Sequence, residues 1–206
     1  GQTGRMAKRG RRGSFIALAV AAGVAWAARE IPRQMGAKAK GERLARMQGS
    51  PQFADGKFHN SVPATMLAAS SMPKLFAETL RDRGRRHPRL PIPVVTPDPG
   101  ASADGLHVTW YGHSSALIEI EGRRVLLDPV WSERCSPSRL SGPKRLHEPP
   151  VALRDLPPLD AVLISHDHYD HLDMETIQNL VDLQAVPFLV PLGVGAHLER
   201  WGVPAT

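Results

Sequence analysis

Residues 164–173 read ISHDHYDHLD and place three histidines and two aspartates within the six positions 166–171, directly after an apolar run. In an extended segment, residues i and i+2 project to the same side, so His166 and His168 point the same way where the strand ends. On a helix the same two side chains would diverge by about 200°. The segment therefore predicts a buried strand that runs into a loop, in which Asp170 and His171 follow the first two histidines.

Neutral imidazole and carboxylate groups are ligands that divalent transition metals accept, and zinc suits this mixture best. Four ligands from so short a segment cannot easily surround one tetrahedral ion, but they can serve two adjacent ions. We expect His166 and His168 on one ion and Asp170 and His171 on the other. The alternative is an exposed histidine-rich loop that binds metal adventitiously, and its position between a buried strand and a capped helix argues against that.

The second half of the chain alternates short β-rich runs with helical patterns, which indicates an α/β fold. Glu121 and Gly122 form a plausible hairpin turn between two of the runs, and Asp173 stands where it can cap a helix. The expected strands are 106–112, 115–122, 123–129, 160–165 and 186–191, and the expected helices are 173–183 and 193–202.

The net charge of +6 is unevenly distributed. Residues 1–46 hold 11 Lys/Arg against 2 Glu, a net of +9, and residues 47–206 hold 15 Lys/Arg against 18 Asp/Glu, a net of −3. The basic charge thus belongs to an N-terminal arm. With aromatic residues at 5% there is little to stack on bases, so no nucleic-acid partner is expected. The single cysteine, Cys135, excludes an intrachain disulfide.

The arm at residues 1–30 has the pattern of a signal or anchor: basic residues precede the 14-residue apolar run 15–28. The run is shorter than the ~20 residues of a comfortable membrane span. We expect membrane association through this segment, or export. The alternative is an alanine-rich helix lying on the rest of a cytoplasmic protein. Residues 31–103 are expected to form a proline-rich linker with one helix, 74–83, ended by Gly84. The basic residues at 83–89 are expected to form a solvated face or, alternatively, to contact phospholipid headgroups.

Ser-His-x-His-x-Asp-His after an apolar strand resembles the signature of the metallo-β-lactamase superfamily. The flanking blocks resemble the N-acylphosphatidylethanolamine-hydrolysing phospholipase D family and its bacterial relatives. The resemblance covers residues 104–206, with a weaker match in FADGKFHN (53–60). Its blocks are TWYGHSS (109–115), LLDPVWSERCSPS (126–138), GPKR (142–145) and LPPLDAVLISHDHYDHLD (156–173).

The resemblance implies an α/β fold of four layers, an αβ/βα sandwich, and a hydrolase with two zinc ions. A metal-bridged hydroxide, oriented by Asp170, would attack a phosphodiester, with phospholipid as the implied substrate. Asp128 would steady the histidine loop from behind the ligands. His113 would lie near the site, although a histidine at a strand end is often a satisfied core residue. Lys144 and Arg145 would meet the phosphate, unless they are only a solvated pair.

The implied ligand set needs a further histidine on each ion and a bridging aspartate downstream of residue 171. Only His197 and Glu199 follow there, apart from acidic residues of the capped helix, and we interpret His197 as lying on a surface helix. Residues 104–206 are therefore expected to form the first αβ half, with an apolar sheet face left exposed. The alternatives are a truncated, inactive fragment, a lactonase or other ester hydrolase of the same fold, and a membrane-surface module.

Overall fold

The computed structural model of the chain describes residues 22–23, 25–26, 29–62, 69–85, 87–97, 105–140 and 142–204, without the side chain of Arg83. Most of the expected signal or anchor segment, residues 1–30, lies outside these ranges. Within the ranges, no helix has both the length and the apolar character needed to span a bilayer.

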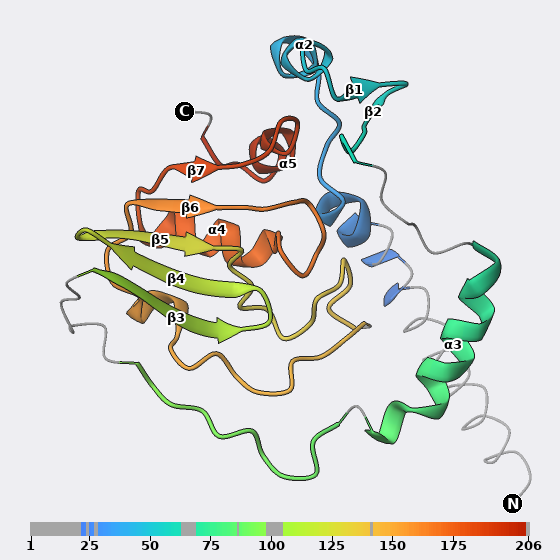
Figure 1. Cartoon of the computed structure of the whole chain (residues 1–206), viewed down its shortest axis with the longest axis vertical. Coiled ribbons are helices and arrows are strands. Elements are labelled where there is room, and N and C mark those ends of the chain that lie inside the picture. Colours follow the sequence, from blue (N-terminus) through green and yellow to red (C-terminus); the bar gives the residue numbers. More distant parts are fainter. Residues whose placement is uncertain are drawn as a thin grey trace, which may run out of the picture.

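A mixed five-stranded sheet forms the centre of the molecule, in the order β3-β4-β5-β6-β7 (Figure 1). The strands β3, β4 and β5 pair antiparallel, and β6 and β7 join them in parallel. The strand runs predicted from the sequence are confirmed, with β4 to β7 shorter than expected. Their bounds are β3 Leu106–Gly112, β4 Ser115–Ile120, β5 Arg123–Leu127, β6 Ala161–Leu163 and β7 Phe188–Leu189.

The predicted turn between β4 and β5 is also confirmed. Glu121 and Gly122 have φ values of +48° and +75°, which a two-residue turn with the twist of the flanking strands requires. The turn fixes the register in which Ile118 pairs with Val125.

One face of the sheet is covered by helices and carries the core (Figure 1). Helix α4 (Met174–Leu183) connects β6 to β7, and α5 (Gly195–Arg200) follows β7. Leu126 and Val162 from the sheet and Ile177 and Leu180 from α4 are fully buried. The cap of α4 is as predicted, because the Asp173 side chain accepts a hydrogen bond from the backbone amide of Glu175.

The opposite face of the sheet is apolar and exposed, as the sequence predicts. Leu106, Val108 and Trp110 alternate along β3 and remain 60–63% exposed. Val108 continues the row across the sheet through its register partners Ile118 and Val125. A largely apolar, exposed sheet face is suited to a second packed layer.

The N-terminal part contains more structure than a linker. Residues 29–34 are helical, and a hairpin turns at Asp55 and Gly56, with the rings of Phe53 and Phe58 5.0 Å apart. The predicted helix is present but starts and ends two residues earlier than expected, with Pro73 in its first turn. Gly84 does not end it, because the helix stops at Arg81 and Gly84 lies in the following 3-10 turn. The elements are α2 Gly41–Gln48, β1 Phe53–Ala54, β2 Lys57–Phe58, η1 Ala69–Ser71, α3 Met72–Arg81 and η2 Arg83–Arg85.

Candidate metal centre

The histidine loop leaves the carboxyl end of β6, as the sequence predicts. Ile164 is buried beneath it. The loop tightens after His168, whose carbonyl accepts hydrogen bonds from the amides of His171 at 3.0 Å and Leu172 at 2.8 Å. The side chains of the loop are thereby gathered at one edge of the sheet.

All three histidines of the loop lie close together. The ring centroids of His166 and His168 are 4.6 Å apart, and those of His166 and His171 are 3.9 Å apart. Such spacing allows several imidazole nitrogens to converge on one region. The rings of His166 and His168 are in edge-to-face contact, so the two side chains lie on the same side of the loop.

His113 comes to this cluster from the connection between β3 and β4. It has a φ of +48°, and its carbonyl accepts a hydrogen bond from the indole nitrogen of Trp110 at 2.9 Å. The neighbouring Ser114 hydroxyl donates to the carbonyl of Asp170 at 2.6 Å. These contacts fix the β3–β4 connection against the histidine loop.

His113, Asp170 and His171 form the tightest donor group in the described part of the chain. One ligand atom from each lies within 4.8 Å of the other two. His113 Nε2 is 2.8 Å from Asp170 Oδ2, and His171 Nε2 is 3.8 Å from the same oxygen. Asp170 and His171 were expected in the ligand set, whereas His113 was expected only nearby.

The strand directions contain the signal for His113. Because β3 and β4, and then β4 and β5, are antiparallel while β5 and β6 are parallel, β3 and β6 run the same way. Their carboxyl ends meet at one sheet edge, and His113 and His166 follow those ends. Two consecutive hairpins followed by a parallel strand were sufficient to predict that His113 and His166 lie at the same end of the sheet.

Asp128 lies under the loop, 3% exposed, with a φ of +41°. Its Oδ1 accepts the amide of Ser165 at 2.7 Å, and its Oδ2 accepts the Ser165 hydroxyl at 2.6 Å. The same Oδ2 is 2.8 Å from His171 Nδ1. When His171 donates from Nδ1 to this carboxylate, Nε2 carries the lone pair and faces the cluster, which is the tautomer a metal ligand needs.

The electrostatics of Asp170 favour its charged form. Partial burial acts to raise the pKa of this carboxyl group, but the hydrogen bond with His113 and the neighbouring imidazoles outweigh it, so the pKa lies below its usual range. The carboxylate is ionised at neutral pH and can act as a ligand or as an acceptor for a water proton.

Lys144 and Arg145 both have protein partners. Lys144 forms an ion pair with Glu133, and its hydrogen bond holds the pKa of Glu133 below the usual range. Arg145 donates to the carbonyls of Val130 at 2.5 Å and Tyr111 at 3.2 Å, and burial lowers its pKa. In this conformation Arg145 ties β3 to the connection between β5 and β6.

The interpretation of His197 as a surface residue is wrong. Its side chain is 18% exposed, its Nδ1 accepts the backbone amide of Ala37 at 2.9 Å, and its Nε2 lies 3.6 Å from Asp167 Oδ2. The sequence could not show this, because the partner at Ala37 is 160 residues away. His197 thus connects the N-terminal segment to the histidine loop and is not one of the converging donors.

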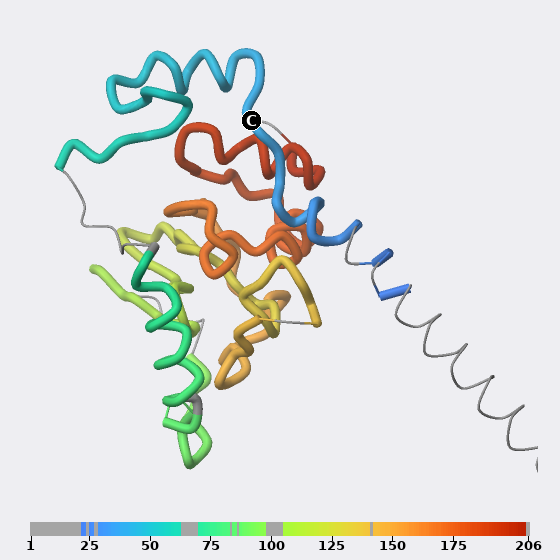
Figure 2. Tube along the Cα trace, turned by 90° about the vertical axis from the view of Figure 1, so that its right-hand side faces the viewer, coloured from blue at the N-terminus to red at the C-terminus, as the bar shows by residue number. Residues whose placement is uncertain are grey.

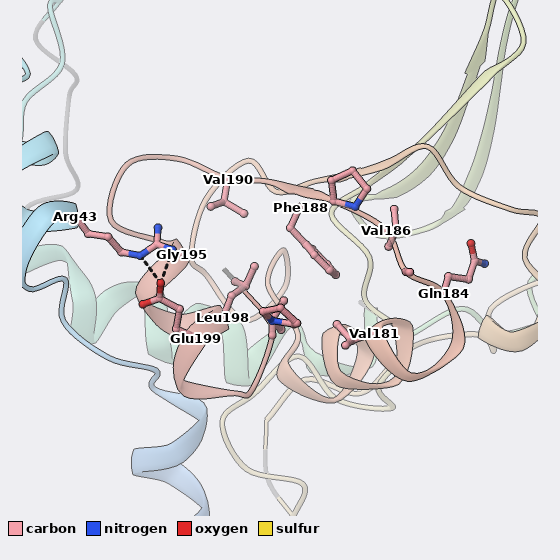
Figure 3. Close-up of a pocket in the computed structure, with 13 residues that line it drawn as sticks. Arg43, Val181, Gln184, Val186, Phe188, Val190, Gly195, Leu198 and Glu199 are labelled. Carbon is pink, nitrogen blue, oxygen red and sulfur yellow. Dashed lines mark hydrogen bonds and ion pairs between the residues drawn. The ribbon is translucent and has the colours of Figure 1, made fainter. Parts of the chain in front are cut away.

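Two pockets lie near these elements. One of about 210 Å³ adjoins the histidine loop. A larger one of about 460 Å³ is lined by β7, α4 and α5 and is bounded at one side by the Arg43–Glu199 ion pair (Figure 3). None of the predicted site residues lines the larger pocket. The smaller pocket is lined by Gln34, Met35, Asp167, His168, Tyr169, Leu172, His197 and Trp201.

The donor set fits a metal centre. It combines imidazole nitrogens with an ionised carboxylate, and the buried carboxylate of Asp128 orients His171 from behind, which is the usual arrangement around a bound divalent ion. The cluster is also open to solvent, since His168 and His113 are exposed. A water molecule or substrate can therefore reach it.

Comparison with known proteins agrees with this chemistry. Residues 123–206 match the Beta-lactamase superfamily domain. An uncharacterized protein of Mycobacterium tuberculosis is 50% identical over 200 residues, which cover 91% of this chain and 54% of the relative. The chain thus spans about half the length of this relative.

Two further relatives have names that state an activity. N-acyl-phosphatidylethanolamine-hydrolyzing phospholipase D 1 of Caenorhabditis elegans is 41% identical over 117 residues, covering 56% of this chain and 33% of the relative. A UPF0173 metal-dependent hydrolase of Caldivirga maquilingensis is 36% identical over 66 residues, covering 32% of this chain and 23% of the relative. Both similarities involve less than half of the relative.

Proposed function

Residues 123–206 form a beta-lactamase superfamily domain, and on that premise we propose that the protein is a metal-dependent hydrolase that cleaves phosphodiesters, with phospholipids as its substrate class. The observation that carries this proposal is the convergence of His113, Asp170 and His171 within 4.8 Å, supported from below by Asp128. The class of substrate is supported by the name of the Caenorhabditis elegans relative.

We assign two ligand positions. His166 and His168 hold one ion, and Asp170 and His171 hold a second, with His113 beside it. Zinc is the proposed metal because imidazole and carboxylate ligands in this proportion suit it. A bound zinc ion acts as a Lewis acid that makes water nucleophilic at neutral pH and neutralises charge on phosphoryl oxygens.

The protein groups have separate tasks in this proposal. Asp170 is ionised and accepts a hydrogen bond from His113, so it can orient a water molecule toward the phosphorus atom. Asp128 keeps His171 and Ser165 in place through three contacts of 2.6–2.8 Å. Positioning of this kind reduces the reorganisation that the reaction would otherwise require.

The test is hydrolysis by the full-length protein that carries this chain. Bis(p-nitrophenyl) phosphate and N-acylphosphatidylethanolamine should be hydrolysed in the presence of Zn²⁺, and p-nitrophenyl acetate should be a poor substrate. Asp170→Asn should abolish turnover, whereas Asp182→Asn, at an exposed position on α4, should not. Preferential hydrolysis of a lactone or a carboxylic ester would contradict the phosphodiester assignment, and metal-independent turnover would contradict the whole proposal.

A further inference from the structure

Helix α3 lies apart from the sheet in Figure 1, and in the perpendicular view of Figure 2 it lies in front of the strands. The elements it contacts most are its sequence neighbours η1 and η2. A ten-residue helix has little stability in water by itself. The exposed side chains of α3 therefore need another environment.

The side chains of α3 separate into two faces. Met72, Leu75, Phe76 and Leu80 are 39–66% exposed, and at 100° per residue they fall within an arc of about 140°. Lys74, Glu78 and Arg81 occupy the other side of the helix. An apolar stripe of this width is typical of a helix that buries one face.

The hydroxyl group of Thr79, which lies within the apolar face, already has a hydrogen-bond partner. Thr79 lies between Leu75 and Phe76 on the helix surface, and its hydroxyl donates to the carbonyl of Leu75 at 2.8 Å. The face can therefore enter an apolar medium without losing a hydrogen bond to water.

The charge around α3 is opposite in sign to that of the domain. Residues 72–90 contain six Lys/Arg and two Asp/Glu, a net of +4, whereas residues 91–206 contain 8 Lys/Arg and 15 Asp/Glu, a net of −7. Arg85, His87 and Arg89 follow the helix and are exposed. An anionic surface would attract this end of the molecule and repel residues 91–206, which favours an orientation with α3 toward the surface.

We propose that α3 is an interfacial helix that lies on anionic phospholipid, with Leu75, Phe76 and Leu80 below the headgroups and the basic residues of 81–89 among them. Amphipathic helices with a basic margin bind membranes in this manner, by apolar burial together with attraction to anionic lipid. The basic residues of 81–89, which form the basic margin of the helix, would have no role in binding a purely apolar protein partner. The proposal is independent of the catalytic assignment and does not involve residues 1–30.

The experiment places an environment-sensitive fluorophore on the helix. In the full chain with Cys135→Ser, the label is attached at Phe76→Cys or, as the matched control, at Glu78→Cys on the opposite side. Vesicles of phosphatidylcholine with phosphatidylglycerol should shift the emission of the label at 76 to the blue and shield it from an aqueous quencher. The label at 78 should stay accessible.

The role of the basic margin is tested by charge reversal. The double change Arg85→Glu and Arg89→Glu should weaken the response at 76 by at least about tenfold, and pure phosphatidylcholine should give a weaker response. If only the N-terminal arm binds the membrane, both labels stay quenchable, and the proposal is overturned. If the label at 76 is shielded before vesicles are added, another protein surface or a second copy covers the helix, which also overturns it.

Discussion

Nε2 of His113 lies 2.8 Å from Oδ2 of Asp170, although 57 positions separate the two residues. The contact joins the end of β3 to the loop after β6, and it brings a histidine from outside the histidine-rich segment to the donor cluster. The candidate metal centre is therefore assembled from two connections at one edge of the sheet rather than from a single loop.

The first prediction concerns this histidine. His113→Ala should weaken Zn²⁺ binding about tenfold or more, because a removed ligand or orienting neighbour typically costs that much affinity. Competition with a chromophoric chelator measures the change. His107→Ala is the matched control, since His107 is an exposed histidine on β3, the strand that precedes His113. Equal affinity in the two variants would remove His113 from the site.

The second prediction concerns Asp128. Asp128→Ala leaves the Ser165 amide and His171 Nδ1 without their acceptor, so we expect a loss of about 1–3 kcal/mol in the free energy of unfolding and about 10–100-fold weaker zinc binding. Urea denaturation and the chelator assay report the two effects. Asp182→Ala, at an exposed position, should change neither, and zinc affinity that survives Asp128→Ala would contradict the orienting role.

The third prediction concerns the contact between the N-terminal segment and α5. At Gly36, with φ at +70°, an added Cβ would lie 1.8 Å from His197 Nδ1. At Gly41, with φ at +53°, an added Cβ would meet nothing within 4 Å. Both alanine variants should be destabilised by about 1 kcal/mol, because alanine disfavours the left-handed backbone conformation. Only Gly36→Ala must also displace His197.

Thermal unfolding and limited proteolysis of the two variants separate the backbone strain, which both variants share, from the steric clash with His197, which only Gly36→Ala has. Gly36→Ala should lower the melting temperature more than Gly41→Ala and should expose residues 29–40 to protease. Identical behaviour of the two variants would mean that the segment does not depend on its contact with His197.

The fourth prediction concerns the N-terminal arm, which we propose as a membrane anchor or export signal. Removing residues 1–28 should convert membrane association that resists high salt into binding that salt releases, because the remaining attraction of α3 is electrostatic in part. Fractionation of cell membranes with a salt wash measures this. Salt-resistant association of the shortened protein would contradict the arm's role as anchor.

Much of the fold was predictable because its determinants are local. Glu121-Gly122 specifies a tight hairpin, and Asp173 specifies the start of α4, so both are confirmed within a residue or two. The hairpin at Asp55-Gly56 has the same kind of signal and was missed among the prolines around it. The alternation of apolar residues along β3 likewise predicted its exposed face.

The contacts that were not predicted join distant parts of the chain. His197 has the spacing of a residue on an amphipathic helix, and its partners are the docked N-terminal segment and Asp167 of the histidine loop. Arg145 has the charge of a phosphate ligand, but the carbonyls of Val130 and Tyr111 occupy its donors. Local sequence does not indicate such partners, because they depend on how elements far apart in the chain are packed.

The most direct test of the account is the metal content of the site. Equilibrium dialysis against Zn²⁺ and elemental analysis should find about two ions bound per full-length protein, as expected for a paired site. The double change His166→Ala and His168→Ala should remove about half of this metal, whereas His87→Ala, at an exposed position, should remove none. Absence of bound transition metal, or metal that remains unchanged when both His166 and His168 are replaced, would contradict the metal centre on which the proposed function depends.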